Sequence, residues 1–205
     1  MSDPIAIVER GYDAIAGEFA TWSSGVDGPK QRYLDDLVRR LPAGAPVLEL
    51  GCGAGSTLAR LAERFDVTGT DLSREQLRRA EERLPGARLV HGDATSLDFL
   101  AASFAAVCSF YVLGHVPRER HATLYRLVAQ WLRPGGLFLL NMGVSDDPGT
   151  VVEWVGGRPM YFSSWPIETN RRLLAEAGFE LLADALEVTH EPEGDTTFQW
   201  VLARR

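Results

Sequence analysis

Residues 47–73 read VLELGCGAGSTLARLAERFDVTGTDLS. The stretch passes from an apolar segment through three closely spaced glycines into an amphipathic segment, and an acid, Asp71, stands near its end. A strand, a glycine turn and a helix start form a general nucleotide site, because glycine lets the backbone approach a ligand closely. The stretch therefore predicts a nucleotide-binding unit, and the residues around it have to show which nucleotide it binds.

Acidic residues surround the predicted turn. The glycines follow a G-x-G-x-G pattern, with Ser56 where a dinucleotide fingerprint carries its third glycine or alanine. Glu49 lies two residues before the first glycine, and Asp71 and Asp93 follow the next two predicted strands. Three acids around one crevice disfavour a pyrophosphate and favour a ligand with positive charge. S-adenosylmethionine has a sulfonium and an ammonium and no phosphate, so it fits the acids better than NAD.

Short apolar segments alternate with amphipathic helical segments from residue 46 onward, a pattern typical of a parallel sheet covered on both faces. The last two strands are joined by THEPEGD, which is too short for a crossover helix and predicts an antiparallel pair at the sheet edge. We expect an α/β, doubly wound, Rossmann-like fold with a seven-stranded, mostly parallel sheet. The predicted strands are Pro46–Leu50, Asp66–Asp71, Ala87–His91, Phe104–Phe110, Gly136–Met142, Phe179–Val188 and Thr196–Ala203.

The chain of 205 residues suits one compact domain with small additions. Within it we expect four parts, which are an N-terminal helical lid at 1–43, a cofactor-binding core at 44–142, a substrate-side insertion at 143–166, and a C-terminal helix and strand pair at 167–205. The lid is predicted because apolar residues recur at helical spacing from Val8 to Trp22.

Charge and composition exclude several classes of protein. The net charge of −7 disfavours nucleic acid and anionic membranes as partners. Two cysteines, Cys52 and Cys108, form neither a disulfide framework nor a metal set, so we expect no metal and a cytoplasmic location. Only one of the 21 basic residues is a lysine, Lys30, a bias typical of GC-rich bacterial genomes.

Five segments in this order resemble the successive motifs of the class I S-adenosylmethionine-dependent methyltransferases, of the small-molecule type. They are VLELGCGAG, the acid in GTDLS, HGDATSL, FAAVCSFYVLGHVP and LRPGGLFLL. The N-terminal YDAIAGEFATW resembles the helix that closes over the cofactor, with Phe19 where tyrosine is common. The resemblance implies sheet order 3-2-1-4-5-7-6, and it covers residues 44–142 best, so it leaves the substrate open.

The resemblance also implies roles for single residues. Asp71 would hold the ribose hydroxyls, Leu72 the adenine face, and Asp93 with Ala94 the adenine edge. The other positions implied at the methionine portion of the cofactor are Gly51, Cys52, Gly53, Phe110 and Tyr12. Structural alternatives stay open: Asp93 could cap the following turn, Tyr12 could belong to the core, and Glu49 could only support the glycine loop.

The substrate side of the site is predicted from polar and aromatic residues. Ser109, Tyr111, His115 and Asn141 follow the fourth and fifth strands, and His115 is a candidate general base or a structural histidine. The segment EWVGGRPMYFSSW could instead form a helix-packing cluster, but its aromatic content favours a substrate wall. Its aromatic residues are Trp154, Tyr161, Phe162 and Trp165.

Together these observations predict an enzyme that transfers a methyl group from S-adenosylmethionine to a small molecule, leaving S-adenosylhomocysteine. We expect O- or N-methylation in bacterial metabolism. Two alternatives remain, an NAD-dependent oxidoreductase and a scaffold or regulator that keeps the fold without turnover.

Overall fold

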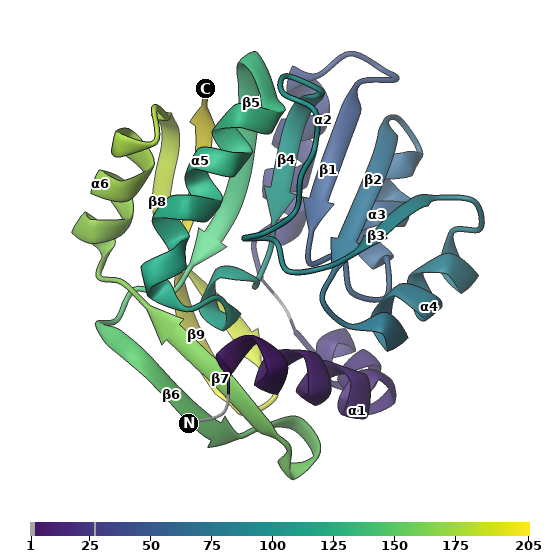
Figure 1. Ribbon diagram of the computed structural model, residues 1–205, viewed down its shortest axis with the longest axis vertical. Helices are drawn as coiled ribbons and strands as arrows, with labels where there is room; N and C mark the ends of the chain where they lie inside the picture. The colour runs from purple at the N-terminus through teal and green to yellow at the C-terminus, as the bar shows by residue number, and fades with distance from the viewer. Residues whose placement is uncertain (1–2, 27) are drawn as a thin grey trace.

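The computed structural model describes residues 3–26 and 28–205; residues 1, 2 and 27 of the predicted lid lie outside the described residues. A seven-stranded sheet has helices on both faces (Figure 1). Its strand order is β3-β2-β1-β4-β5-β9-β8, which confirms the expected fold and order. The strands are β1 Pro46–Leu50, β2 Asp66–Asp71, β3 Arg88–His91, β4 Phe104–Ser109, β5 Leu132–Met142, β8 Glu180–Glu191 and β9 Gly194–Arg204.

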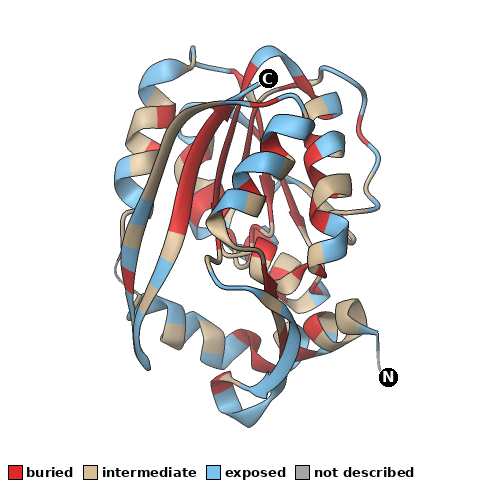
Figure 2. Ribbon diagram, turned by 90° about the vertical axis from the view of Figure 1, so that its left-hand side faces the viewer, coloured by how far each residue is buried: buried red, intermediate tan, exposed pale blue. Residues whose placement is uncertain are grey.

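The first five strands pair in parallel, and β9 pairs antiparallel with both β5 and β8. One face of the sheet packs on α5 (His121–Trp131) and α6 (Ile167–Glu176), and the other on α2 (Lys30–Arg40), α3 (Ser56–Ala62) and α4 (Arg74–Arg83). Figure 2 shows buried residues concentrated in the sheet and on the helix faces turned toward it. Both faces of the parallel strands are thereby removed from water, as their continuous apolar sequences require.

Helix α1 (Pro4–Ser24) lies across the end of the sheet where the parallel strands finish (Figure 1). The Asp3 side chain caps its first turn by accepting a hydrogen bond from the Ile5 amide at 3.1 Å. A Cβ on Gly11 would lie 2.8 Å from Cε of Met160, so glycine is needed for close packing of α1 on the chain beneath. Among the described residues, no helix is long and apolar enough to span a bilayer.

The predicted insertion contains a second, two-stranded sheet that the sequence did not predict. Strand β6 (Asp147–Glu153) pairs antiparallel with β7 (Pro159–Ser164). The connection is a short 3-10 turn, η3 (Val155–Gly157), in which Gly156 has φ +64° and Gly157 has φ +66°. Strand β7 contacts α1 and a second 3-10 turn, η1 (Leu113–His115), so the hairpin closes one side of the strand ends.

Candidate functional site

The turn after β1 requires glycine. Gly51, Gly53 and Gly55 have φ of +64°, +53° and +77°, in the left-handed region that other residues avoid. A Cβ on Gly51 would also lie 2.3 Å from Cγ2 of Val112, in the segment after β4. The carboxyl end of β1 therefore presents backbone rather than side chains at this point.

Two of the three predicted acids hold backbone turns at the strand ends. Asp71 accepts hydrogen bonds from the amides of Gly53 at 2.8 Å and Ser73 at 2.9 Å. Burial raises the pKa of Asp71, and these amide donors oppose that rise. Asp93 accepts from the Thr95 amide at 2.8 Å and forms an ion pair with Arg120 at 3.2 Å. Both acids thus have structural roles in addition to lining the site.

The third acid, Glu49, lacks a full set of partners. It is 3% exposed, and its Oε2 has no hydrogen-bond partner among the described residues. Burial raises the pKa of Glu49 to about 8, while the Lys30 ammonium acts in the opposite direction. A buried carboxyl of this kind gains most from a cation placed beside it.

These acids border a cavity of about 400 Å³, which we call the strand-end cavity. Arg83 is a basic residue of its wall, and its Nε donates to the Ala54 carbonyl at 2.9 Å. The cavity is lined by every residue that the sequence placed at the cofactor, namely Tyr12, Glu49, Gly51, Cys52, Gly53, Asp71, Leu72, Asp93, Ala94 and Phe110.

The sequence did not predict Gln76 as a wall residue of this cavity. Ser73 and Gln76 have the spacing of a capping box, and the Ser73 hydroxyl accepts from the Gln76 amide at 3.1 Å. The reciprocal contact is not formed. The Gln76 side chain is 1% exposed, and neither polar atom of its amide has a partner among the described residues. The position of Gln76 in the cavity wall depends on how α4 packs against the sheet, so no local signal in the sequence indicates it.

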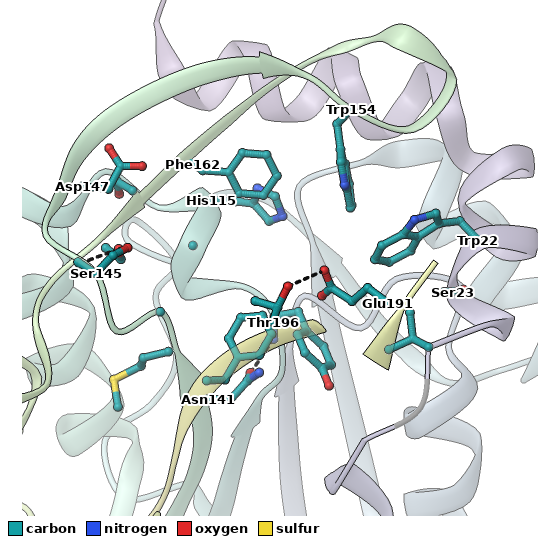
Figure 3. Close-up of a pocket in the computed structure, with 18 of the residues that line it drawn as sticks. Trp22, Ser23, His115, Asn141, Ser145, Asp147, Trp154, Phe162, Glu191 and Thr196 are labelled. Carbon is teal, nitrogen blue, oxygen red and sulfur yellow. Dashed lines mark hydrogen bonds between the residues drawn. The ribbon is translucent and has the colours of Figure 1, made fainter. Parts of the chain in front are cut away.

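A second cavity of about 360 Å³, the aromatic cavity, is drawn in Figure 3. It shares wall residues with the strand-end cavity and therefore adjoins it. Of the predicted substrate residues, Tyr111, Asn141, Trp154 and Phe162 line it. The sequence did not assign its remaining principal wall residues, which are Phe19, Trp22, Ser145, Asp147, Glu191, Thr196 and Phe198.

Three of the predicted substrate-side residues line neither cavity. The Trp165 ring lies 3.9 Å from the Arg118 guanidinium and its Nε1 donates to the Arg118 carbonyl at 2.9 Å, so Trp165 packs outside both cavities. Tyr161 is buried in the cluster between α1 and β7 and lines neither cavity. Ser109 is fully buried and also lines neither. Neighbouring residues of a strand point to opposite faces, which explains why Phe162 reaches the cavity and Tyr161 does not.

His115 and Tyr12 stand where the two cavities meet, since both residues line both cavities. The His115 Nδ1 lies 3.0 Å from the Tyr161 carbonyl, which can only accept, so Nδ1 carries the proton. The Nε2 of the neutral ring then accepts from the Tyr12 hydroxyl at 2.8 Å. Burial lowers the pKa of His115 to about 4. The imidazole is therefore neutral, and its lone pair is already engaged.

Asn141 fixes the chain at the base of the aromatic cavity. Its Oδ1 accepts from the Tyr111 amide at 2.7 Å and so holds Tyr111, whose φ is +60°. That donor determines the orientation of the side-chain amide. Nδ2 is left without a partner among the described residues, although Asn141 is only 1% exposed and lines the cavity.

Known methyltransferases resemble this chain in sequence. Residues 47–136 match the family model of a methyltransferase domain. The 2-methyl-6-phytyl-1,4-hydroquinone methyltransferase of Synechocystis is 31% identical over 79% of this chain and 51% of its own length. The 27-O-demethylrifamycin SV methyltransferase of Amycolatopsis mediterranei is 33% identical over 65% of this chain and 57% of its own length. The chain thus spans about half the length of these curated relatives.

Solved structures share the fold. The crystal structure of Burkholderia thailandensis 1,6-didemethyltoxoflavin-N1-methyltransferase, with bound 1,6-didemethyltoxoflavin and S-adenosylhomocysteine, has a TM-score of 0.75 at 20% identity. The structural alignment covers 100% of this chain and 91% of the Burkholderia chain. An S-adenosylmethionine-dependent methyltransferase of Methanosarcina mazei has a TM-score of 0.72 at 18% identity, over 83% of this chain and 96% of its own. Together with the motifs, the family model and the curated relatives show that the chain belongs to the class I S-adenosylmethionine-dependent methyltransferases. The two solved structures, both below 25% identity, show that it shares their fold.

Proposed function

We propose that the protein transfers a methyl group from S-adenosylmethionine, bound in the strand-end cavity, to a small molecule in the aromatic cavity. The observation that carries this proposal is the shared wall. Tyr12, Tyr111 and His115 line both cavities, so a ligand in one lies next to a ligand in the other. Methyl transfer requires this adjacency, because nucleophile, methyl carbon and sulfur must lie in line.

The residues of the strand-end cavity fit the cofactor. Glu49 has a buried carboxyl oxygen without a partner, which suits a ligand that brings positive charge. Gln76 has an unpaired amide that can both donate and accept, which suits the hydroxyls and ring nitrogens of an adenosine. Asp71 and Asp93 keep lone pairs beyond those used by the backbone turns, and we assign them to the ribose and the adenine edge.

S-adenosylmethionine supplies a methyl group activated by its sulfonium. The chain has to bind the cofactor and the acceptor, align the reacting atoms and exclude water from them. The rings of Phe19 and Trp154 pack 5.7 Å apart in the wall of the aromatic cavity, where their apolar faces help to exclude water. Tyr12 and His115 hold each other and thus fix the wall between the two ligands. Because the His115 lone pair is engaged, we assign His115 to positioning rather than to general base catalysis.

Calorimetry tests the choice of cofactor. The protein should bind S-adenosylmethionine and S-adenosylhomocysteine, and Glu49→Gln should weaken S-adenosylmethionine binding while keeping the fold. Binding of NAD in their place would support the oxidoreductase alternative, which the comparisons do not favour. Release of S-adenosylhomocysteine with a panel of small aromatic amines and phenols tests turnover. Binding without release from any member would favour a non-catalytic scaffold. The expected cytoplasmic location and the exclusion of nucleic acid stay predictions.

A further inference from the structure

The aromatic cavity has a distinctive arrangement of rings. The Trp22 and Trp154 rings lie 5.0 Å apart at 70°, and Trp154 and Phe162 lie 5.6 Å apart at 90°. Figure 3 shows these three rings around one space, with Trp22 supplied by α1 and the other two by the hairpin. Ring faces carry negative electrostatic potential, so rings set at steep angles around one space favour a cation or an alkylated nitrogen.

The charges of the cavity have one sign. Its charged wall residues are Asp147 and Glu191, and no lysine or arginine is found among the described wall residues. The two oxygens of Asp147 accept from Gly149 and Thr150 in a local turn. Glu191 accepts from the Thr196 hydroxyl at 3.0 Å, and Figure 3 shows its carboxylate directed into the space below His115. An anionic acceptor would meet repulsion here without a compensating cation.

Two basic groups lie close to the cavity but do not line it. The Lys30 ammonium is 5.9 Å from the centroid of the Tyr111 ring, and Glu49 is the carboxyl whose charge acts on it. Arg118 stacks on Trp165 and forms an ion pair with Asp146. Neither is a wall residue, so neither changes the sign of the charge that faces an acceptor.

An unpaired donor at the base of the cavity indicates a bound ligand independently of the charges. Asn141 is 1% exposed, its Oδ1 is used by the Tyr111 amide, and its Nδ2 has no partner among the described residues. A buried amide donor is costly unless a ligand accepts its hydrogen bond. The acceptor molecule should therefore carry an oxygen or another lone pair at that end.

We propose that the methyl acceptor is a small-molecule amine and that the methyl group is transferred to its nitrogen. This inference rests on the proposed methyl transfer. The amine reacts in its neutral form, which an alkylammonium reaches by giving one proton to water before it enters the cavity. The nitrogen then gives its electron pair to the methyl carbon while the carbon–sulfur bond breaks and its electron pair returns to sulfur. The positive charge thus moves from the sulfonium to a methylammonium, which can afterwards lose a proton to water.

The cavity stabilises the positive charge that develops on the acceptor nitrogen during methyl transfer. As the nitrogen becomes positive, its attraction to Glu191 and to the ring faces of Trp22 and Trp154 grows, so these contacts are stronger in the transition state than with the neutral amine. A phenol or carboxylic acid gains nothing from them. A phenol would have to react as a phenolate, but the lone pair of His115 is held by Tyr12 and no lysine or arginine among the described wall residues would stabilise the anion.

Matched probes test the inference. Calorimetry with the protein saturated with S-adenosylhomocysteine should compare N,N,N-trimethyl-2-phenylethylammonium, 2-phenylethanol and 3-phenylpropanoate. We expect the ammonium to bind about tenfold more tightly than the alcohol, and the carboxylate to bind most weakly. Glu191→Gln should reduce the affinity for the ammonium about fivefold and leave that for the alcohol unchanged. Glu180→Gln, which removes a carboxylate paired with Arg204 far from the cavity, is the control.

With S-adenosylmethionine, 2-phenylethylamine should yield its N-methyl product, detected by mass, and 2-phenylethanol should yield none. Failure of the ammonium to bind more tightly than both other probes, including failure to bind at all, overturns the inference. So does an unchanged preference in Glu191→Gln. If S-adenosylmethionine itself does not bind, the proposed function fails; if it binds and the cavity prefers the carboxylate, only the amine inference fails.

Discussion

Replacing His115 by glutamine should remove a pH-dependent part of the protein's stability. Burial lowers the pKa of His115 from 6.5 to about 4 in the folded protein. Between these values the unfolded chain binds a proton that the native state does not, so the free energy of unfolding falls as the pH falls. The buried site is not screened by solvent, and the lowering corresponds to about 3 kcal/mol when fully expressed.

From pH 7.5 to pH 4.5 this one imidazole should account for a loss of about 2–3 kcal/mol. For a chain of this length that is about 5–10 °C in Tm. Urea unfolding of the wild-type protein and of His115→Gln at both pH values measures the difference. The variant should lose less stability than the wild type by that amount, while Leu100→Ala, at an exposed apolar residue that does not contact His115, should show the same pH dependence as the wild type. If the two proteins lose stability equally, His115 is not held neutral and the tautomer argument fails.

Titration of S-adenosylmethionine in buffers of different ionisation enthalpy should show proton release near pH 7, because burial raises the pKa of Glu49 to about 8 and a cationic ligand favours the charged form. Equal release from Glu49→Gln would contradict this. Gly11→Ala should lower the free energy of unfolding by about 1–3 kcal/mol, since its Cβ would lie 3.2 Å from a backbone carbonyl of β7. Gly17→Ala, where the nearest atom is 3.4 Å away at a side-chain tip, should instead raise it by about 0.5–1 kcal/mol; urea unfolding that ranks the two alike would refute the packing argument. Trp154→Ala should weaken binding of the trimethylammonium probe about tenfold, and Trp165→Ala should lower Tm without changing that affinity. If both variants bound the trimethylammonium probe more weakly, Trp165 would have to line the aromatic cavity after all.

The strands, and the gathering of the predicted cofactor residues around one cavity, could be predicted from the sequence because their signals are local. Buried parallel strands read as continuous apolar runs, and the turn at Gly51 depends on the backbone conformation of a few consecutive residues. The hairpin of β6 and β7 was missed because its residues carry no such signal. Val151 and Val152 are adjacent, and both are about half exposed, so no alternation marks the strand.

The acceptor side could be predicted only in part, since it depends on tertiary pairing. Glu191 lies in a segment that reads as a turn, and it reaches the cavity because β8 and β9 extend beyond the other strands as a long pair. Trp22 reads as one member of an apolar helix stripe. Glu193 at the end of the same pair accepts from its indole nitrogen at 2.7 Å, and no pattern within α1 indicates that contact.

Helix α1 contributes Tyr12, Phe19 and Ser23 to both cavities. A displacement of this one helix opens the walls around cofactor and acceptor together. Each ligand that holds the helix in place therefore prepares the site for the other, and thermodynamic linkage requires the two effects to be equal. Cofactor and acceptor should raise each other's affinity by the same factor, and exchange of spent cofactor and methylated product should share a single gating motion.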